Sequence, residues 1–240
     1  MEQAFTSWSG GKDCCLAYYR AVANGLQVRY LVNMLTEDGQ RSRSHGLAAK
    51  WLQMQAQAID IPLLQRRTTS AGYESEFKST LLALKSEGIT VGVFGDIDFN
   101  EHRQWIDRVC HEGGGITPYL PLWGESQNKI LQEFIGLGFE AVVVATRADV
   151  LGDEWLGRKL DSDFLADLAK LENITLCGEA GEYHTLVTNG PLFQKRLQII
   201  EANKVLSDDH WFLDIVKCEL KPKTDGESIR SPEEYEVTRH

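Results

Sequence analysis

Short apolar runs alternate with longer amphipathic segments through the first 146 residues. Segments with the length and β-branched content of strands occur at 4–8, 28–35, 63–67, 91–95 and 141–145. Apolar residues at helical spacing mark the segments near 13–24, 46–58, 73–87, 100–111 and 126–137. Such alternation, with near-continuous apolar strands, is typical of a parallel sheet covered on both faces. We therefore predict an α/β fold with a doubly wound, five-stranded parallel sheet.

The pattern changes after residue 147. Apolar positions predict one helix over 153–171, and β-like segments follow at 175–177, 185–187, 197–200 and 211–216. Turn-forming residues between the last two segments predict a hairpin. We expect a main domain at 1–147, a smaller C-terminal α+β domain at 148–220 and a polar tail at 221–240.

Charge and composition narrow the class of protein. The 240-residue chain has a formal net charge of −10, which argues against nucleic acid or an anionic membrane as a partner but leaves room for a basic pocket. The N-terminus lacks the pattern of a signal peptide and no apolar run approaches the length of a membrane span, so we expect a cytoplasmic location. The five cysteines form no CxxC pair, which argues against a zinc site.

The segment Ser9-Gly10-Gly11-Lys12-Asp13 carries the strongest chemical signal, because it joins a strand-like segment to a helix. Glycines let the backbone approach a phosphate, amides at a helix start point at the anion, and a lysine adds positive charge. An ordinary Gly-Gly turn into a helix is the alternative. The spacing differs from that of the mononucleotide P-loop, since Thr6 and Asp13 stand where that pattern needs Gly and Ser or Thr.

Polar residues also follow other predicted strands, at the sheet edge where ligands bind in this class of fold. Asp13 is a candidate ligand for Mg²⁺, or a residue that only stabilises the first helical turn. Asp96 is a candidate nucleotide contact or a simple turn residue. His45, at a predicted helix start, is a candidate nucleotide contact or a surface residue.

A second informative segment is Gly178-Glu179-Ala180-Gly181-Glu182-Tyr183-His184-Thr185. Gly181 would permit close approach of a substrate. Glu179 and Glu182 would bind its cationic or amide-like group, hold Mg²⁺ or act as a general base. A polar loop with glycine turns is the alternative.

Together the two segments resemble a known family. The first is similar to the SGGxDS pyrophosphatase loop (PP-loop) of the N-type ATP pyrophosphatases. The second resembles the GEGGEYET-like segment of the diphthine–ammonia ligase (diphthamide synthetase) family and its prokaryotic relatives. Stretches at 95–97, 121–124 and 155–161 also match, and the likeness covers roughly residues 1–220. It implies an adenine nucleotide alpha hydrolase-like domain that binds ATP and a smaller C-terminal domain.

The resemblance also implies an activity, the ATP-dependent formation of an amide. A carboxylate is adenylated with release of pyrophosphate, and ammonium then attacks the adenylate. The acceptor would be the diphthine of a translation factor or an unknown small molecule, and Mg²⁺ would accompany ATP. The implied ATP-binding residues are Ser9, Gly10, Gly11, Lys12, Asp13, Cys14, His45 and Asp96.

The implied catalytic residues are Lys12, Asp13, Glu179 and Glu182, with Asp13 as the metal ligand. Candidate substrate contacts are Trp123, Gly124, Arg158, Gly181, Tyr183 and His184. The alternative for Arg158 is a solvated helix face, and the alternative for the two aromatic residues is the core.

Three residues depart from the family pattern. Cys14 replaces Ser, Ala180 replaces Gly, and His184 replaces an acidic residue. The thiol matters because it is a weaker hydrogen-bond donor than a hydroxyl. A protein that binds ATP or AMP without turnover therefore stays open as an alternative function. A tRNA-modifying adenylating enzyme, which would share the pyrophosphatase loop, is a second alternative. Assembly into a homo-oligomer also stays open.

Overall fold

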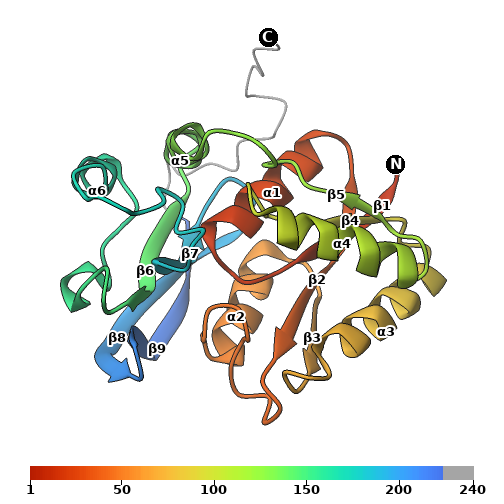
Figure 1. Cartoon of the computed structure of the whole chain (residues 1–240), viewed down its shortest axis with the longest axis horizontal. Coiled ribbons are helices and arrows are strands. Elements are labelled where there is room, and N and C mark those ends of the chain that lie inside the picture. Colours follow the sequence, from red (N-terminus) through yellow and green to blue (C-terminus); the bar gives the residue numbers. More distant parts are fainter. Residues whose placement is uncertain (224–240) are drawn as a thin grey trace.

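The computed structural model describes residues 1–223, so the predicted polar tail lies outside the described residues from 224 onward. Five strands form a parallel sheet in the order β3-β2-β1-β4-β5 (Figure 1). Because β1 lies in the centre with two strands on either side, the predicted doubly wound, five-stranded parallel sheet is confirmed. The strands are β1 Gln3–Ser7, β2 Gln27–Leu35, β3 Leu63–Arg67, β4 Val91–Val93 and β5 Thr117–Tyr119.

Helices cover both faces of this sheet, as neighbouring residues of β1 show. Ala4 belongs to the apolar core formed with α1 and α2, whereas Phe5 belongs to the core formed with α3 and α4. Successive strand residues point to opposite faces, so both faces are packed. The helices are α1 Lys12–Ala23, α2 Ala49–Ile59, α3 Tyr73–Ser86 and α4 Asn100–Glu112. A fifth helix, α5 Gln127–Gly136, lies beside α1, where Glu133 accepts hydrogen bonds from Arg20.

A second, antiparallel sheet has the order β7-β6-β9-β8 and packs against α1 and α2 (Figure 1). The predicted hairpin is confirmed and is longer than expected, with its turn at Asp208 and Asp209. The strands are β6 Glu140–Arg147, β7 Tyr183–Asn189, β8 Lys195–Ser207 and β9 His210–Pro222. Among residues 1–223, no helix is long and apolar enough to cross a membrane.

The predicted strand at 141–145 exists, but its assignment to the parallel sheet was wrong. It forms β6, which pairs with β7 and β9 in the antiparallel sheet. Its central residues are buried on both faces, so it has the apolar run that is typical of a parallel strand. The fifth parallel strand is instead β5, whose three residues include Pro118. We therefore propose that the boundary between the two parts lies between β5 and α5 and not at residue 147.

The predicted helix over 153–171 is also interrupted. The structure has a short 3₁₀ helix at Asp153–Trp155 and a helix, α6, at Ser162–Leu168. Between them the backbone pairs with β6, since the Gly157 amide donates to Val143 and the Val143 amide donates to Arg158. The predicted strand at 175–177 forms a turn instead, which the Gly178 amide closes on Thr175.

Candidate active site

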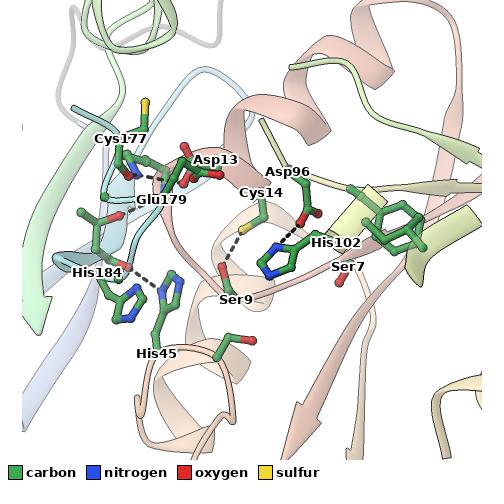
Figure 2. Close-up of a pocket in the computed structure, with 18 of the residues that line it drawn as sticks. Ser7, Ser9, Asp13, Cys14, His45, Asp96, His102, Cys177, Glu179 and His184 are labelled. Atoms are coloured by element: carbon green, nitrogen blue, oxygen red, sulfur yellow. Dashed lines mark hydrogen bonds and ion pairs between the residues drawn. The ribbon is translucent and has the colours of Figure 1, made fainter. Parts of the chain in front are cut away.

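A cavity of about 480 Å³ opens at the carboxyl edge of the parallel sheet, where α1 begins (Figure 2). Its walls are the ends of β1 and β4, the starts of α1, α3 and α4, a loop at 44–45, and the segment 177–185. The two segments with the strongest sequence signals therefore meet in space, although they are far apart along the chain. The predicted site residues that line the cavity are Ser9, Lys12, Asp13, Cys14, His45, Asp96, Glu179, Gly181, Tyr183 and His184.

The phosphate loop, residues 9–13, is fixed by contacts with the second sheet and α2. Gly10 has a φ of +81°, and a Cβ there would lie 2.4 Å from Leu52 Cδ2, so only glycine fits. Its carbonyl accepts hydrogen bonds from the Val187 amide at 2.9 Å and the Gln55 side chain at 3.0 Å. The C-terminal part of the chain thus holds the loop of the N-terminal part.

Two amides of the loop have partners within the protein. The Gly11 amide donates to Ser9 Oγ at 3.3 Å, and the Lys12 amide donates to Thr185 Oγ1 at 3.0 Å. The expectation that these amides point freely at an anion is therefore not met. The Cys14 thiol lies 3.2 Å from the Gly11 carbonyl and 3.5 Å from Ser9 Oγ, so it still makes the local contacts of the loop.

Lys12 and Asp13 form a buried ion pair at the base of the cavity. Lys12 is 4% exposed, and its Nζ donates to Asp13 Oδ2 at 2.8 Å and to the Cys177 carbonyl. It also lies 5.1 Å from the centre of the Tyr183 ring. Burial alone would lower the pKa of Lys12, but Asp13 and the other neighbours outweigh it and raise the pKa. The ammonium therefore stays charged.

The second carboxylate oxygen of Asp13 suits a cation. Asp13 Oδ1 is buried and has no hydrogen-bond partner among the described residues, which is an uncommon state for a carboxylate. No group of three or more His, Cys, Asp or Glu side chains in residues 1–223 could hold a metal ion. A single carboxylate is nevertheless enough for Mg²⁺, which usually keeps several waters and takes its other ligands from substrate phosphates. Asp13 thus fits the Mg²⁺ that accompanies ATP.

Two further acidic residues face the same part of the cavity. Burial raises the pKa of Glu179 to about 7, and the negative charge of Asp13 adds to this effect. Asp96 lies shortly after the end of β4 and accepts a hydrogen bond of 3.2 Å from His102 Nδ1 (Figure 2). This contact raises the pKa of His102, although partial burial opposes it. The raised pKa of Glu179 therefore places the ionisation of this carboxyl group near neutral pH.

The other end of the cavity is aromatic. Tyr73 and Phe77 come from the start of α3, Phe94 follows β4, and Trp105 comes from α4. The Trp105 ring centre lies 5.8 Å from Tyr73 and 5.5 Å from Phe77. Our sequence interpretation missed this wall, because aromatic residues in amphipathic helices are usually core residues. Their position near helix starts that follow strand ends was the available signal.

Glu182 does not line the cavity, contrary to its predicted catalytic role. It is 1% exposed, and its two oxygens accept hydrogen bonds from the Thr175 amide at 2.6 Å and the Thr175 hydroxyl at 2.9 Å. The φ of +80° at Gly181 turns the chain between the two acidic residues, so that only Glu179 reaches the cavity. Glu182 is therefore a buried residue that supports the cavity wall.

Three predicted substrate contacts also lie outside the cavity. The Trp123 ring is covered by the Arg103 guanidinium at 5.4 Å, and the Gly124 amide donates to Ile97 at 2.8 Å in a turn. Arg158 pairs with Asp167 at 2.7 Å and stacks on the Trp155 ring at 4.5 Å. These groups already have protein partners and belong to the packing of the fold.

Gly95 determines how closely β4 approaches α1. A Cβ at this position would lie 2.8 Å from the backbone of both Asp13 and Cys14. We predict that Gly95→Ala lowers the free energy of unfolding by about 1–3 kcal/mol, because the backbone atoms must move apart. It should also weaken ATP binding, since Asp13 moves with them. Chemical denaturation and calorimetric titration with ATP measure the two effects.

Gly136→Ala is the matched control, because Gly136 ends α5 and has nothing within 4 Å of its added Cβ. It should leave ATP binding unchanged and should be neutral or stabilise by up to about 1 kcal/mol. Equal stability of the two variants would contradict the close packing of Gly95.

Two family models of known proteins match most of the chain. Residues 2–116 match the family model of the diphthamide synthase N-terminal domain, and residues 126–220 match that of the diphthamide synthase C-terminal domain. The chain is 27% identical to a diphthine–ammonia ligase of Rattus norvegicus, covering 97% of this chain and 96% of that protein. It is 29% identical to a diphthine–ammonia ligase of Bos taurus, covering 83% of each.

Among solved structures, the chain is similar to a predicted subunit of tRNA methyltransferase from Methanocaldococcus jannaschii. The TM-score is 0.44 and the identity 15%, over 79% of this chain and 98% of that one, a likeness too slight to assign a function. The two family models, in contrast, follow one another along most of the chain. The chain therefore belongs to the diphthamide synthase family.

Proposed function

We propose that this protein is an ATP-dependent, AMP-forming carbon–nitrogen ligase of the diphthine–ammonia ligase type. The observation that carries the proposal is the buried Lys12–Asp13 pair at the start of α1, which shares one cavity with Glu179. The Lys12 ammonium suits the phosphates of ATP, and the Asp13 carboxylate suits their cation. The Glu179 carboxylate suits an amine nucleophile. The full-length likeness to curated diphthine–ammonia ligases supports the same reaction.

The first half-reaction is the adenylation of a carboxylate. The acceptor oxygen attacks the α-phosphorus of ATP, and negative charge moves onto the departing pyrophosphate. The Lys12 ammonium, fixed by Asp13 and the Cys177 carbonyl, stabilises that charge without having to reorganise. Mg²⁺, held through Asp13 Oδ1, would neutralise phosphate charge when it is bound.

The second half-reaction needs ammonia, although ammonium is the abundant species at neutral pH. Asp13, Asp96 and Glu179 make this part of the cavity negative, and that charge attracts a small cation. Glu179 ionises near pH 7 and can accept the proton that ammonium must lose before it attacks. The products are the amide and AMP.

The aromatic end of the cavity suits a flat ring or the apolar part of a substrate. The relatives are named as ligases that join ammonia to diphthine, and we propose the diphthine of a translation factor as the acceptor here. A small-molecule carboxylate is the other acceptor that the same chemistry would serve. We further propose that the reaction takes place in the cytoplasm.

Labelled ATP tests the proposal. The protein is incubated with ATP, Mg²⁺, ammonium and a translation factor purified with its diphthine unamidated, and the nucleotide and phosphate products are separated. We expect AMP and pyrophosphate in equal amounts. Repeated turnover should require both the acceptor and ammonium. Release of ADP and phosphate instead would contradict an adenylating mechanism.

A further inference from the structure

His45 and His184 form a stacked pair beside the phosphate loop (Figure 2). Their ring centres lie 4.4 Å apart and their planes differ by 20°. The His45 ring packs directly on the loop, because a Cβ at Gly11 would come within 2.4 Å of its Cε1. Both rings line the cavity that contains Lys12. The two half-reactions described above assign neither ring a proton-transfer role.

Hydrogen bonding orients the His45 ring. His45 Nδ1 lies 3.2 Å from the Thr185 carbonyl oxygen, which can only accept a hydrogen bond. Nδ1 therefore carries a proton, and in the neutral ring Nε2 holds the free lone pair. The Thr185 hydroxyl accepts from the Lys12 amide, so one residue positions both His45 and the first turn of α1.

The surroundings hold both rings neutral when the cavity contains no nucleotide. Burial lowers the pKa of His45 well below its ordinary value, and His184 and Lys12 lower it further. Burial also lowers the pKa of His184 to about 4, with contributions from Lys12 on α1 and His210 on β9. The opposing groups are weaker, namely the Thr185 carbonyl for His45 and the Glu182 carboxylate for His184.

ATP reverses this balance, because it brings several negative charges into the cavity that the two rings share with Lys12. An imidazole beside new negative charge gains affinity for a proton. We propose that the His45–His184 pair takes up one proton when ATP binds and returns it to pyrophosphate when that product forms. This inference rests on the proposed adenylation.

The proton balance of the step is complete. The acceptor carboxylate oxygen forms a bond to the α-phosphorus, and the bond between that phosphorus and the bridging oxygen breaks. The electron pair stays on the pyrophosphate oxygen, which is basic. The proton on the imidazole pair moves to pyrophosphate, and the pair returns to its neutral state for the next cycle.

Calorimetry measures the proton directly. A non-cleavable analogue, α,β-methylene ATP, is titrated into the protein at pH 7.5 with saturating Mg²⁺, in buffers that differ in ionisation enthalpy. The slope of binding enthalpy against ionisation enthalpy gives the number of protons taken up. We expect about one proton for the wild-type protein, since one protonated imidazole discourages protonation of the ring stacked on it.

Three variants locate the proton. Asn at position 45 can still donate to the Thr185 carbonyl but cannot gain a proton. In His45→Asn or His184→Asn the remaining histidine can still take up the proton, so each single variant should keep a positive slope. The double variant should have a slope near zero and should bind the analogue about tenfold or more weakly than wild type, because the proton taken up contributes to binding. His111→Asn is the control, because His111 is exposed on α4 and outside the cavity, and its slope should equal that of wild type.

The outcomes separate this inference from the proposed function. Analogue binding with no proton uptake by the wild-type protein, or an unchanged slope in the double variant, would overturn the inference and leave the ligase proposal standing. A wild-type protein that does not bind the analogue at all would overturn the proposed function. Should the double variant not fold, the wild-type slope decides, because a slope near zero overturns the inference.

Discussion

Lys12→Ala is expected to lower kcat/KM for ATP by about 10³-fold or more, because it removes the one buried ammonium that lines the cavity in the described residues. Its partner Asp13 would then be a buried carboxylate without a counter-charge, at a cost of about 3–5 kcal/mol in the free energy of unfolding. Steady-state kinetics and urea denaturation measure the two losses.

A second variant separates loss of chemistry from loss of folding. In Lys12→Gln combined with Asp13→Asn both charges are removed, so much of the stability should return while activity does not. Lys129→Ala is the control, since Lys129 is exposed on α5 and does not line the cavity. If Lys12→Ala kept more than about a tenth of the wild-type kcat/KM, the phosphate site would have to lie elsewhere.

Glu179→Gln is expected to lower kcat for amide formation by about 10²–10⁴-fold, the usual contribution of a general base. Because the pKa of Glu179 is raised to about 7, its carboxyl is ionised and able to accept a proton only above that pH. The wild-type profile should therefore change slope near pH 7, where Glu179 ionises, whereas the rate of the variant should follow only the fraction of free ammonia and show no change of slope there. A pH–rate profile at saturating ATP measures the difference.

The same substitution should stabilise the fold at high pH. The folded-state pKa of Glu179 lies above its ordinary value of 4.5, so its contribution to stability is complete below pH 4.5 and is lost as the pH rises through about 7. A glutamine stays neutral, and Glu179→Gln should be more stable than wild type above pH 7 by up to about 3 kcal/mol. The control Glu172→Gln, at an exposed position, should change neither profile. A variant that is less stable at pH 8, or whose profile still changes slope near pH 7 as that of wild type does, would contradict this role.

The sequence was sufficient for the parts of the site that depend on local chain geometry. The loop from Ser9 to Lys12 joins β1 to α1 and turns at Gly10, as its glycines and its position between a strand and a helix predict. The partners of its amides include a distant residue, Thr185, and the sequence did not predict them. The doubly wound sheet follows in the same way from the alternation of strands and helices.

What the sequence left undecided depends on contacts between distant segments. Glu179 and Glu182 have the same chemistry, and only the turn at Gly181 and the partner Thr175 decide which of them reaches the cavity. Trp105 looks like a core residue in its helix, and only its packing against α3 makes it part of the cavity wall.

The main wrong prediction about the fold was the sheet to which a strand belongs. β6 lies between β7 and β9, and most of its residues are buried whichever face of the sheet they point to. Its near-continuous apolar sequence therefore looks like that of a parallel strand. β5 has only three residues and contains Pro118, which leaves too short a signal to recognise. In both cases the neighbouring strands decide which sheet the strand joins, and hydrophobic periodicity carries no information about those neighbours.

The central claim is that an acceptor carboxylate attacks the α-phosphorus of ATP in the cavity at the start of α1. Labelling the acceptor carboxylate with ¹⁸O tests it most directly, because adenylation followed by amide formation transfers one acceptor oxygen to the nucleotide. With a diphthine-bearing translation factor, ammonium, Mg²⁺ and ATP, mass spectrometry should find one ¹⁸O in the phosphate of AMP. Transfer of the label to inorganic phosphate, together with formation of ADP, would contradict the account.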